Sequence, residues 1–165
     1  MSDRRLQDRL QPSLLDRLTD DAPGQRTEPR GARAIDARRL RDIIQRDLGW
    51  LLNTCNLDDQ LDGAAHPHAA ASVLNYGVAD VAGNFSVSAR AEMIRDAIRR
   101  AIATFEPRID PATLEVILRS EENARRTVIS YDIRADMWAQ PLPLSLYLRS
   151  EVDLTTGTLE LDAVG

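Results

Sequence analysis

The chain has 165 residues, of which 43% are apolar, so it can form one domain with a hydrophobic core, and its net charge is −5. All 21 basic residues are arginine, but they form no dense basic stripe, which argues against nucleic-acid binding. The charged N-terminus does not resemble a signal peptide, no apolar run is long enough to span a membrane, and Cys55 is the single cysteine, so we expect a cytoplasmic protein without membrane insertion or an internal disulfide bond.

Residues 1–19 predict a helical leader segment. Leucines recur there at helical spacing, and Ser13 is the predicted N-cap of a short helix with the sequence LLDRLT. A helix this short cannot bury its own apolar stripe. Leu14, Leu15 and Leu18 therefore either dock on the chain's own domain or fill a partner's groove, and the sequence leaves both alternatives open.

Two further segments lack a regular apolar pattern. Residues 20–34 contain two prolines, two glycines and no large apolar residue, which predicts a flexible linker ahead of a domain of residues 35–165. Residues 55–87 are loop-like, and their first part, residues 55–71, matches no motif, so its role stays open.

Two segments predict amphipathic helices that pack on a core. The first is residues 36–54 with Asp36 as its N-cap, and the second is residues 88–105 with Ser88 as its cap. Their apolar faces consist of Leu40, Ile43, Ile44, Leu48, Leu51 and Leu52 in the first, and Ile94, Ala97, Ile98, Ala101, Ile102 and Phe105 in the second.

After the second helix the apolar pattern changes to alternation, which predicts strands. Residues 113–120, 127–139, 146–154 and 158–164 fit this pattern, with polar turns between them and a change of face near Ala135 that suggests a bulge. Helices followed by strands indicate an α+β fold, in which two main helices pack on a mostly antiparallel sheet.

Few residues are candidates for catalysis or metal binding. Cys55, His66 and His68 could bind zinc, but their spacing fits no closed zinc site, and surface histidines are the simpler interpretation. A glycosidase needs two carboxylates, for which Glu106 and Asp47 are the candidates with the most apolar surroundings. No glycine-rich phosphate loop occurs, and we predict no cofactor, metal or catalytic residue.

The tripeptide Glu106-Pro107-Arg108 ends the second helix. Proline disfavours the helical conformation of the residue before it, so Glu106 should be extended, and it should point the same way as Arg108. Taken alone, this spacing fits a helix stop with an exposed ion pair, which contributes about 0–1 kcal/mol. The same tripeptide at residues 28–30 lies in the linker and follows no helix.

Several segments together resemble the TssE family, the type VI secretion baseplate proteins related to the small wedge protein of contractile phage tails. These segments are PSLLDRL (12–18), RRLRDIIQRDLGWLLNT (38–54), SVLNYGVADVAG (72–83), IRRAIATFEPRID (98–110) and LYLRSEVDLTTG (146–157). The resemblance covers residues 12–160. In that family the Glu-Pro-Arg tripeptide after the second long helix is linked to sheath assembly, which assigns Glu106, Pro107 and Arg108 to partner binding.

The resemblance also implies a function and a set of partners. It implies a structural baseplate component that anchors and seeds sheath polymerisation, located at the cytoplasmic face of the inner membrane. The domain would be similar to the handshake part of the sheath subunits. The implied partners are TssF and TssG in the wedge, the sheath subunits TssB and TssC, and also TssK and the VgrG spike.

Two alternatives belong to other functional classes. The family was once labelled lysozyme-like, so one alternative is a peptidoglycan-cleaving glycosidase with Glu106 as the general acid. Its substrate would lie across a membrane, and the N-terminal residues do not resemble a signal peptide. The other alternative is a regulatory adaptor that has the same fold and an unrelated partner.

Overall fold

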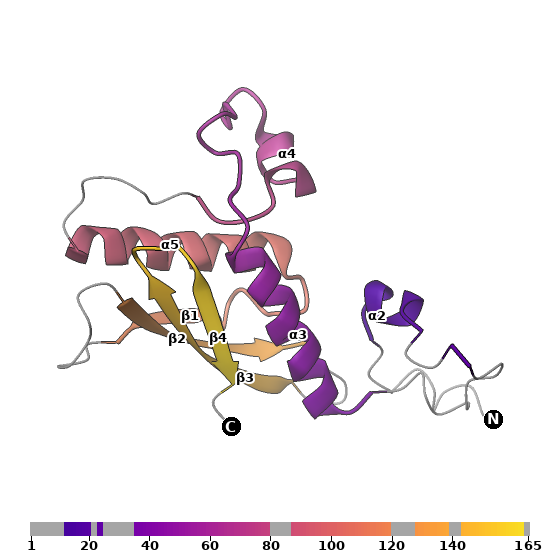
Figure 1. Ribbon diagram of the computed structural model, residues 1–165. Coiled ribbons are helices and arrows are strands. Elements are labelled where there is room, and N and C mark those ends of the chain that lie inside the picture. Colours follow the sequence, from indigo (N-terminus) through magenta and orange to yellow (C-terminus); the bar gives the residue numbers. More distant parts are fainter. Residues whose placement is uncertain are drawn as a thin grey trace.

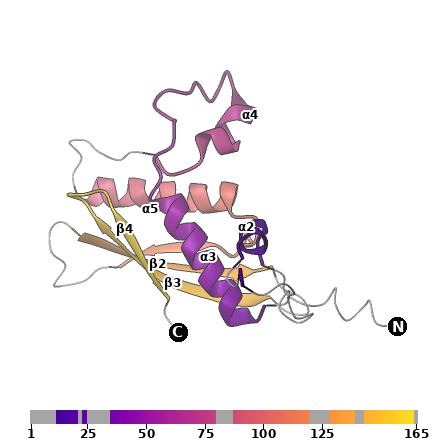
Figure 2. The same ribbon diagram turned by 45° about the vertical axis from the view of Figure 1, so that its right-hand side comes forward.

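The computed structural model describes residues 12–20, 23–24, 35–79, 87–119, 128–138 and 143–163. Two long helices, α3 (Ala37–Leu52) and α5 (Val87–Phe105), pack on one face of a four-stranded sheet (Figures 1 and 2). The strands are β1 (Glu115–Leu118), β2 (Val128–Met137), β3 (Leu144–Asp153) and β4 (Leu159–Ala163), in the order β1-β2-β3-β4, and all pairs are antiparallel. The predicted α+β fold is confirmed.

Helix α3 forms where the sequence predicts it. The Asp36 side chain accepts a hydrogen bond of 2.7 Å from the Arg39 backbone N–H, which satisfies one of the free donors of the first turn. All six predicted apolar positions of this helix are buried. The helix therefore packs on the core through a single face, and its opposite face carries arginine and aspartate residues to the surface.

Helix α5 is the longest element and lies across the sheet. Its apolar residues Ile94, Ile98 and Ile102 are buried, and the buried Tyr131 of β2 donates a hydrogen bond of 2.9 Å to the Ala91 carbonyl. This bond fixes the helix to the middle of the sheet. Because the helix begins at Val87, Ser88 is its second residue, and the prediction that Ser88 is the N-cap is wrong.

The pairing of β2 with β3 is unbroken over ten residues, from Val128 opposite Asp153 to Met137 opposite Leu144. The bulge predicted near Ala135 is therefore wrong. Ala135 and Met137 are buried and continue the core-facing side of β2. The alternation of core-facing and outward-facing residues therefore runs through Ala135 without a break. The predicted turn between the first two strands and most of the predicted linker lie outside the described residues.

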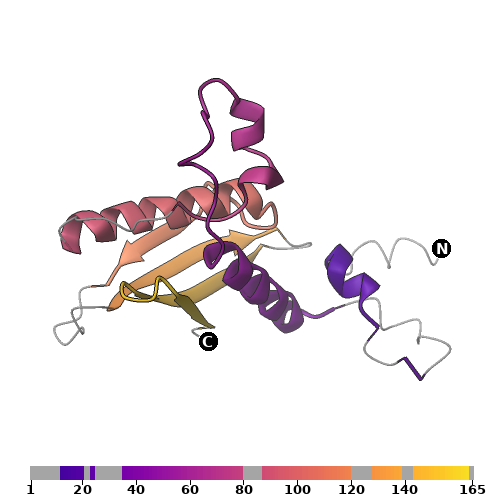
Figure 3. The same cartoon turned by 45° about the horizontal axis from the view of Figure 1, so that its top comes forward.

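The segment between α3 and α5 rises away from the sheet (Figure 3) and contains α4 (Pro67–Ala70) and the 3-10 turn η1 (Val73–Asn75). Its two ends meet at a parallel bridge between Cys55 and Val78. Gly77 makes this approach possible, since its φ is 126° and an added Cβ would lie 2.2 Å from the Thr54 carbonyl oxygen. Among the described residues, no helix is long and apolar enough to cross a membrane.

Candidate partner-binding site

The Glu106 carboxylate lies at the end of α5 and is only 5% exposed. It accepts hydrogen bonds from the Arg108 backbone N–H at 3.1 Å, from Arg108 Nε at 2.6 Å, and from Arg108 Nη2. Pro107 holds the two residues in the turn that allows these bonds. The predicted side-by-side placement is confirmed, but it arises in a turn, closed by the bond of 3.2 Å from the Ile109 N–H to the Glu106 carbonyl, and not in the extended segment that was predicted. The expectation of an exposed ion pair is wrong, because Glu106 is almost completely buried.

A second carboxylate, Asp47, reaches the same arginine from α3. Arg108 Nη2 donates to Asp47 Oδ2 at 2.7 Å, so the guanidinium joins α3 to the end of α5. Burial alone would lower the pKa of Arg108, but the hydrogen bonds and charges of Glu106 and Asp47 outweigh it, and the pKa is raised. Arg108 therefore stays charged, with 28% of its side chain exposed.

The ion network continues from Asp47 to the leader. Arg46 donates to Asp47 Oδ1 from Nε at 3.0 Å and from Nη2 at 2.7 Å. It also binds both carboxylate oxygens of Asp16 in α2 (Leu14–Leu18), at 2.6 and 3.1 Å. These bonds from Arg46 lower the pKa of Asp16 from 3.8 to about 2. Acidic and basic groups thus alternate from the leader to the end of α5.

This arrangement resolves the two alternatives for the leader only in part. The leader docks on its own domain through Asp16, and Ser13 is its N-cap as predicted. However, Leu14, Leu15 and Leu18 are 69%, 50% and 74% exposed. The attachment is electrostatic, and the apolar stripe is left on the surface.

Both tryptophan residues of the chain contact members of the ion network, which the sequence analysis missed. The Arg46 guanidinium carbon lies 4.8 Å from the centre of the Trp50 ring, and the backbone N–H of Trp138 donates to the backbone carbonyl of Arg108 at 2.8 Å. Their side chains remain exposed, at 51% and 65%. Tryptophan and arginine dominate the energetics of protein interfaces, but the sequence alone shows neither the exposure of these tryptophans nor their contacts with the network.

Tyr76 connects this site to the segment between α3 and α5. Its ring packs edge-on against Phe105, with ring centres 5.4 Å apart, directly before Glu106. Burial and the negative charges of Asp47 and Glu106 raise the pKa of Tyr76. The raised segment is therefore packed against the same end of α5, while Val73 and Leu74 of η1 are 80% and 70% exposed.

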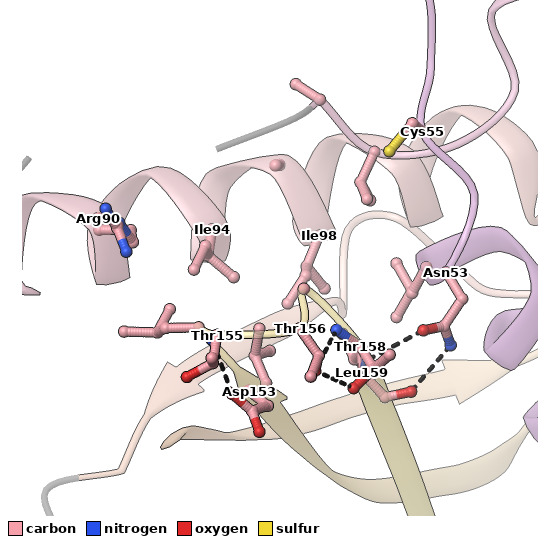
Figure 4. A pocket seen from close by; sticks show the side chains of 17 residues that line it. Asn53, Cys55, Arg90, Ile94, Ile98, Asp153, Thr155, Thr156, Thr158 and Leu159 are labelled. Atoms are coloured by element: carbon pink, nitrogen blue, oxygen red, sulfur yellow. Dashed lines mark hydrogen bonds between the residues drawn. The ribbon is translucent and has the colours of Figure 1, made fainter. Parts of the chain in front are cut away.

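The geometry is poorly suited to glycoside hydrolysis. A general acid must reach the leaving oxygen of the substrate, whereas Glu106 is buried and both its oxygens are bound by Arg108. A cavity of about 500 Å³ lies elsewhere, between α5 and the turn from β3 to β4 (Figure 4). Among the described residues, no group of three His, Cys, Asp or Glu side chains, including Cys55, His66 and His68, could hold a metal ion.

Tryptophan and arginine are enriched at protein–protein interfaces, and here two exposed tryptophan residues contact a charged network in a small α+β domain. A model of the family described as baseplate wedge protein gp25 matches residues 38–142, which is more than half of the chain. The chain belongs to this family of baseplate wedge proteins, and membership implies interaction with other baseplate proteins. No curated protein and no solved structure matches the chain significantly.

Proposed function

We propose that this chain is a non-enzymatic wedge component of a type VI secretion baseplate, which anchors and seeds the polymerisation of a contractile sheath. Its wedge partners would be TssF and TssG, its sheath partners TssB and TssC, and its neighbours in the baseplate TssK and the VgrG spike. The assembly would lie at the cytoplasmic face of the inner membrane. Family membership supports the wedge role, and the resemblance to TssE supports the type VI system.

The observation that carries this proposal is the fixed position of Arg108. A guanidinium on a flexible side chain loses rotamer entropy when it binds, which weakens recognition. Here Glu106 and Asp47 already hold Arg108 from two sides, while part of its side chain stays at the surface. The arginine is therefore ordered before a partner arrives, and Pro107 keeps the supporting turn rigid.

The mechanism we propose for sheath seeding is strand addition. Antiparallel sheets have edges with unpaired N–H and C=O groups, onto which an extended segment of another chain can pair. The four-stranded sheet of this domain has two such edges, at β1 and β4. The exposed Leu14, Leu15 and Leu18 would serve a different contact, in a groove of TssF or TssG.

Sheath counting in cells tests this function. Cells carrying Arg108→Ala at the wild-type level of folded protein should form at least about tenfold fewer fluorescent sheaths, because truncating one member of an interfacial charge pair costs about 2–5 kcal/mol. The linker copy of the tripeptide provides the matched control, so Glu28→Ala and Arg30→Ala should assemble normally. Equal sheath numbers in Arg108→Ala and wild type would refute the assignment, as would equal failure of the linker variants.

A further inference from the structure

The two edges of the sheet differ in whether they can accept a strand. This difference bears on the strand addition proposed above and rests on that proposed function. In an antiparallel pair, one residue turns its N–H and C=O groups toward the neighbouring strand, and the next residue turns them away from it. An edge is open only where the groups that point away have no partner, so each edge can be judged from its hydrogen bonds.

The β4 edge is covered by two side chains, one from α3 and one from the residue that follows it. Asn53 accepts from the Leu159 N–H at 2.9 Å and donates to the Leu159 carbonyl at 2.8 Å (Figure 4). Gln45 donates to the Leu161 carbonyl at 2.7 Å. One amide that offers both a donor and an acceptor to the same residue takes the place of a neighbouring strand. An incoming chain would have to break these bonds.

The β1 edge is open in the described part of the chain. The Arg119 N–H donates to the Ser130 carbonyl at 2.9 Å, so the backbone groups of Arg119 face β2. Because this direction alternates along a strand, the N–H and C=O groups of Glu115 and Ile117 face β2 as well. The N–H and C=O groups of Val116 and Leu118 therefore point away from the sheet, and no described residue is hydrogen-bonded to them. Ile117 and Leu118 are also 42% and 39% exposed, which makes this edge apolar as well as unpaired.

The same edge leads to the ion network. The Ile109–Met137 bridge and the bond from the Trp138 N–H to the Arg108 carbonyl place these residues on the side of β2 that also pairs with β1. Leu118 lies opposite Tyr131, and Arg108 lies beside Trp138. Tyr131 and Trp138 are seven residues apart in the sequence, and a strand rises about 3.3 Å per residue. The edge from Leu118 to Arg108 is therefore roughly 23 Å long.

We propose that β1, and not β4, is the edge that receives the partner's strand. The occupant is an extended segment of about seven or eight residues from a sheath subunit, which covers this length at about 3.3 Å per residue. It pairs with the outward groups of Val116 and Leu118 and reaches Arg108 at its end. Apolar side chains at alternate positions of the segment cover the exposed Leu118, while Arg108 fixes how far the segment extends along the edge.

The test removes one outward N–H from each edge. Leu118→Pro deletes a donor that points away from β2, which an edge strand tolerates, and Ala163→Pro is the matched change on β4. Leu118→Pro should reduce sheath number by about tenfold or more, since added strands bind through main-chain hydrogen bonds, and Ala163→Pro should not. In wild type, purified TssB–TssC sheath complex should slow amide hydrogen exchange in residues 115–119 and leave residues 159–163 unchanged.

Several outcomes would overturn the inference. Normal assembly by a folded Leu118→Pro protein contradicts it, and so does a selective defect in Ala163→Pro or protection of β4 instead of β1. If Leu118→Pro fails to fold, the hydrogen-exchange result in wild type decides alone. Arg108→Ala distinguishes failure of the β1-edge inference from failure of the proposed function. A loss of sheaths there, with both proline variants normal, refutes the β1 edge and keeps the proposed function, whereas normal assembly in all three refutes both.

Discussion

Glu106 is nearly inaccessible to water, so removing its carboxylate deprives Arg108 of its main partner. Desolvating a charged group without compensation is costly, and breaking one side of a buried ion pair typically destabilises a protein by about 3–5 kcal/mol. Arg108 keeps Asp47 and some contact with solvent, which reduces this cost. One of its nitrogens, Nη1, is buried without a hydrogen-bond partner among the described residues. The Glu106–Arg108 pair therefore contributes to the stability of the fold as well as to the ordering of Arg108.

At this scale we predict that Glu106→Ala lowers the free energy of unfolding by about 2–4 kcal/mol. Glu106→Gln should cost less, because an amide oxygen still accepts a hydrogen bond from Arg108. Urea unfolding followed by circular dichroism measures both values, with Glu28→Ala in the predicted linker as the control expected to change neither. A change below about 1 kcal/mol in Glu106→Ala would show that the pair behaves as an exposed one.

At the scale of elements, the leader helix α2 depends on the domain for its order. Five residues form too few helical hydrogen bonds to persist alone in water. Its leucines are exposed, and the only salt bridge of α2 in the described structure joins Asp16 to Arg46. This ion pair positions the leader without burying its apolar stripe, which leaves the stripe free for a partner.

The docking of α2 should therefore be lost in acid. The pKa of Asp16 is about 2 when docked and 3.8 ordinarily, so the undocked leader takes up its proton more readily. Docking is stabilised above about pH 4 and weakens as the pH falls from about 4 to 2. In a Trp138→Phe background, the fluorescence of Trp50 beside Arg46 should report this step. Asp16→Asn should lack it, and an identical titration in that variant would contradict the assignment.

For the whole molecule, local patterns predicted the elements well and long-range contacts poorly. Apolar spacing identified the buried faces of α3 and α5 because each face packs on one core, and alternation identified the strands for the same reason. The burial of Glu106 and the contact of Arg108 with Asp47, 61 positions earlier, could not be predicted, since both depend on tertiary packing. The closure of the β4 edge by Asn53 and Gln45 is likewise a tertiary contact.

Two parts of the candidate site could be predicted from the sequence. They were the tripeptide, through its resemblance to the TssE family, and the leucines of the leader, through their helical spacing. The tripeptide predicted that Glu106 and Arg108 lie together, which the structure confirms. Partner binding by Leu14, Leu15 and Leu18 stays a prediction. The two tryptophans entered only through the fold, because Trp50 lies outside the apolar face of α3 and Trp138 follows β2 directly.

The exposed leader gives a final prediction about the assembled protein. Leu15→Asp with Leu18→Asp should leave the melting temperature of the isolated protein nearly unchanged, since these side chains are 50% and 74% exposed and substitutions at exposed positions change stability little. The same pair of changes should reduce co-purification of TssF and TssG with the tagged protein, as charge in an apolar groove is costly to desolvate. Mass spectrometry of the purified complexes measures this loss.

Leu40→Asp, at a buried position of α3, is the contrasting control, and it should lower the melting temperature itself. A large drop in melting temperature with the leader variant would mean instead that the leucines pack on their own domain.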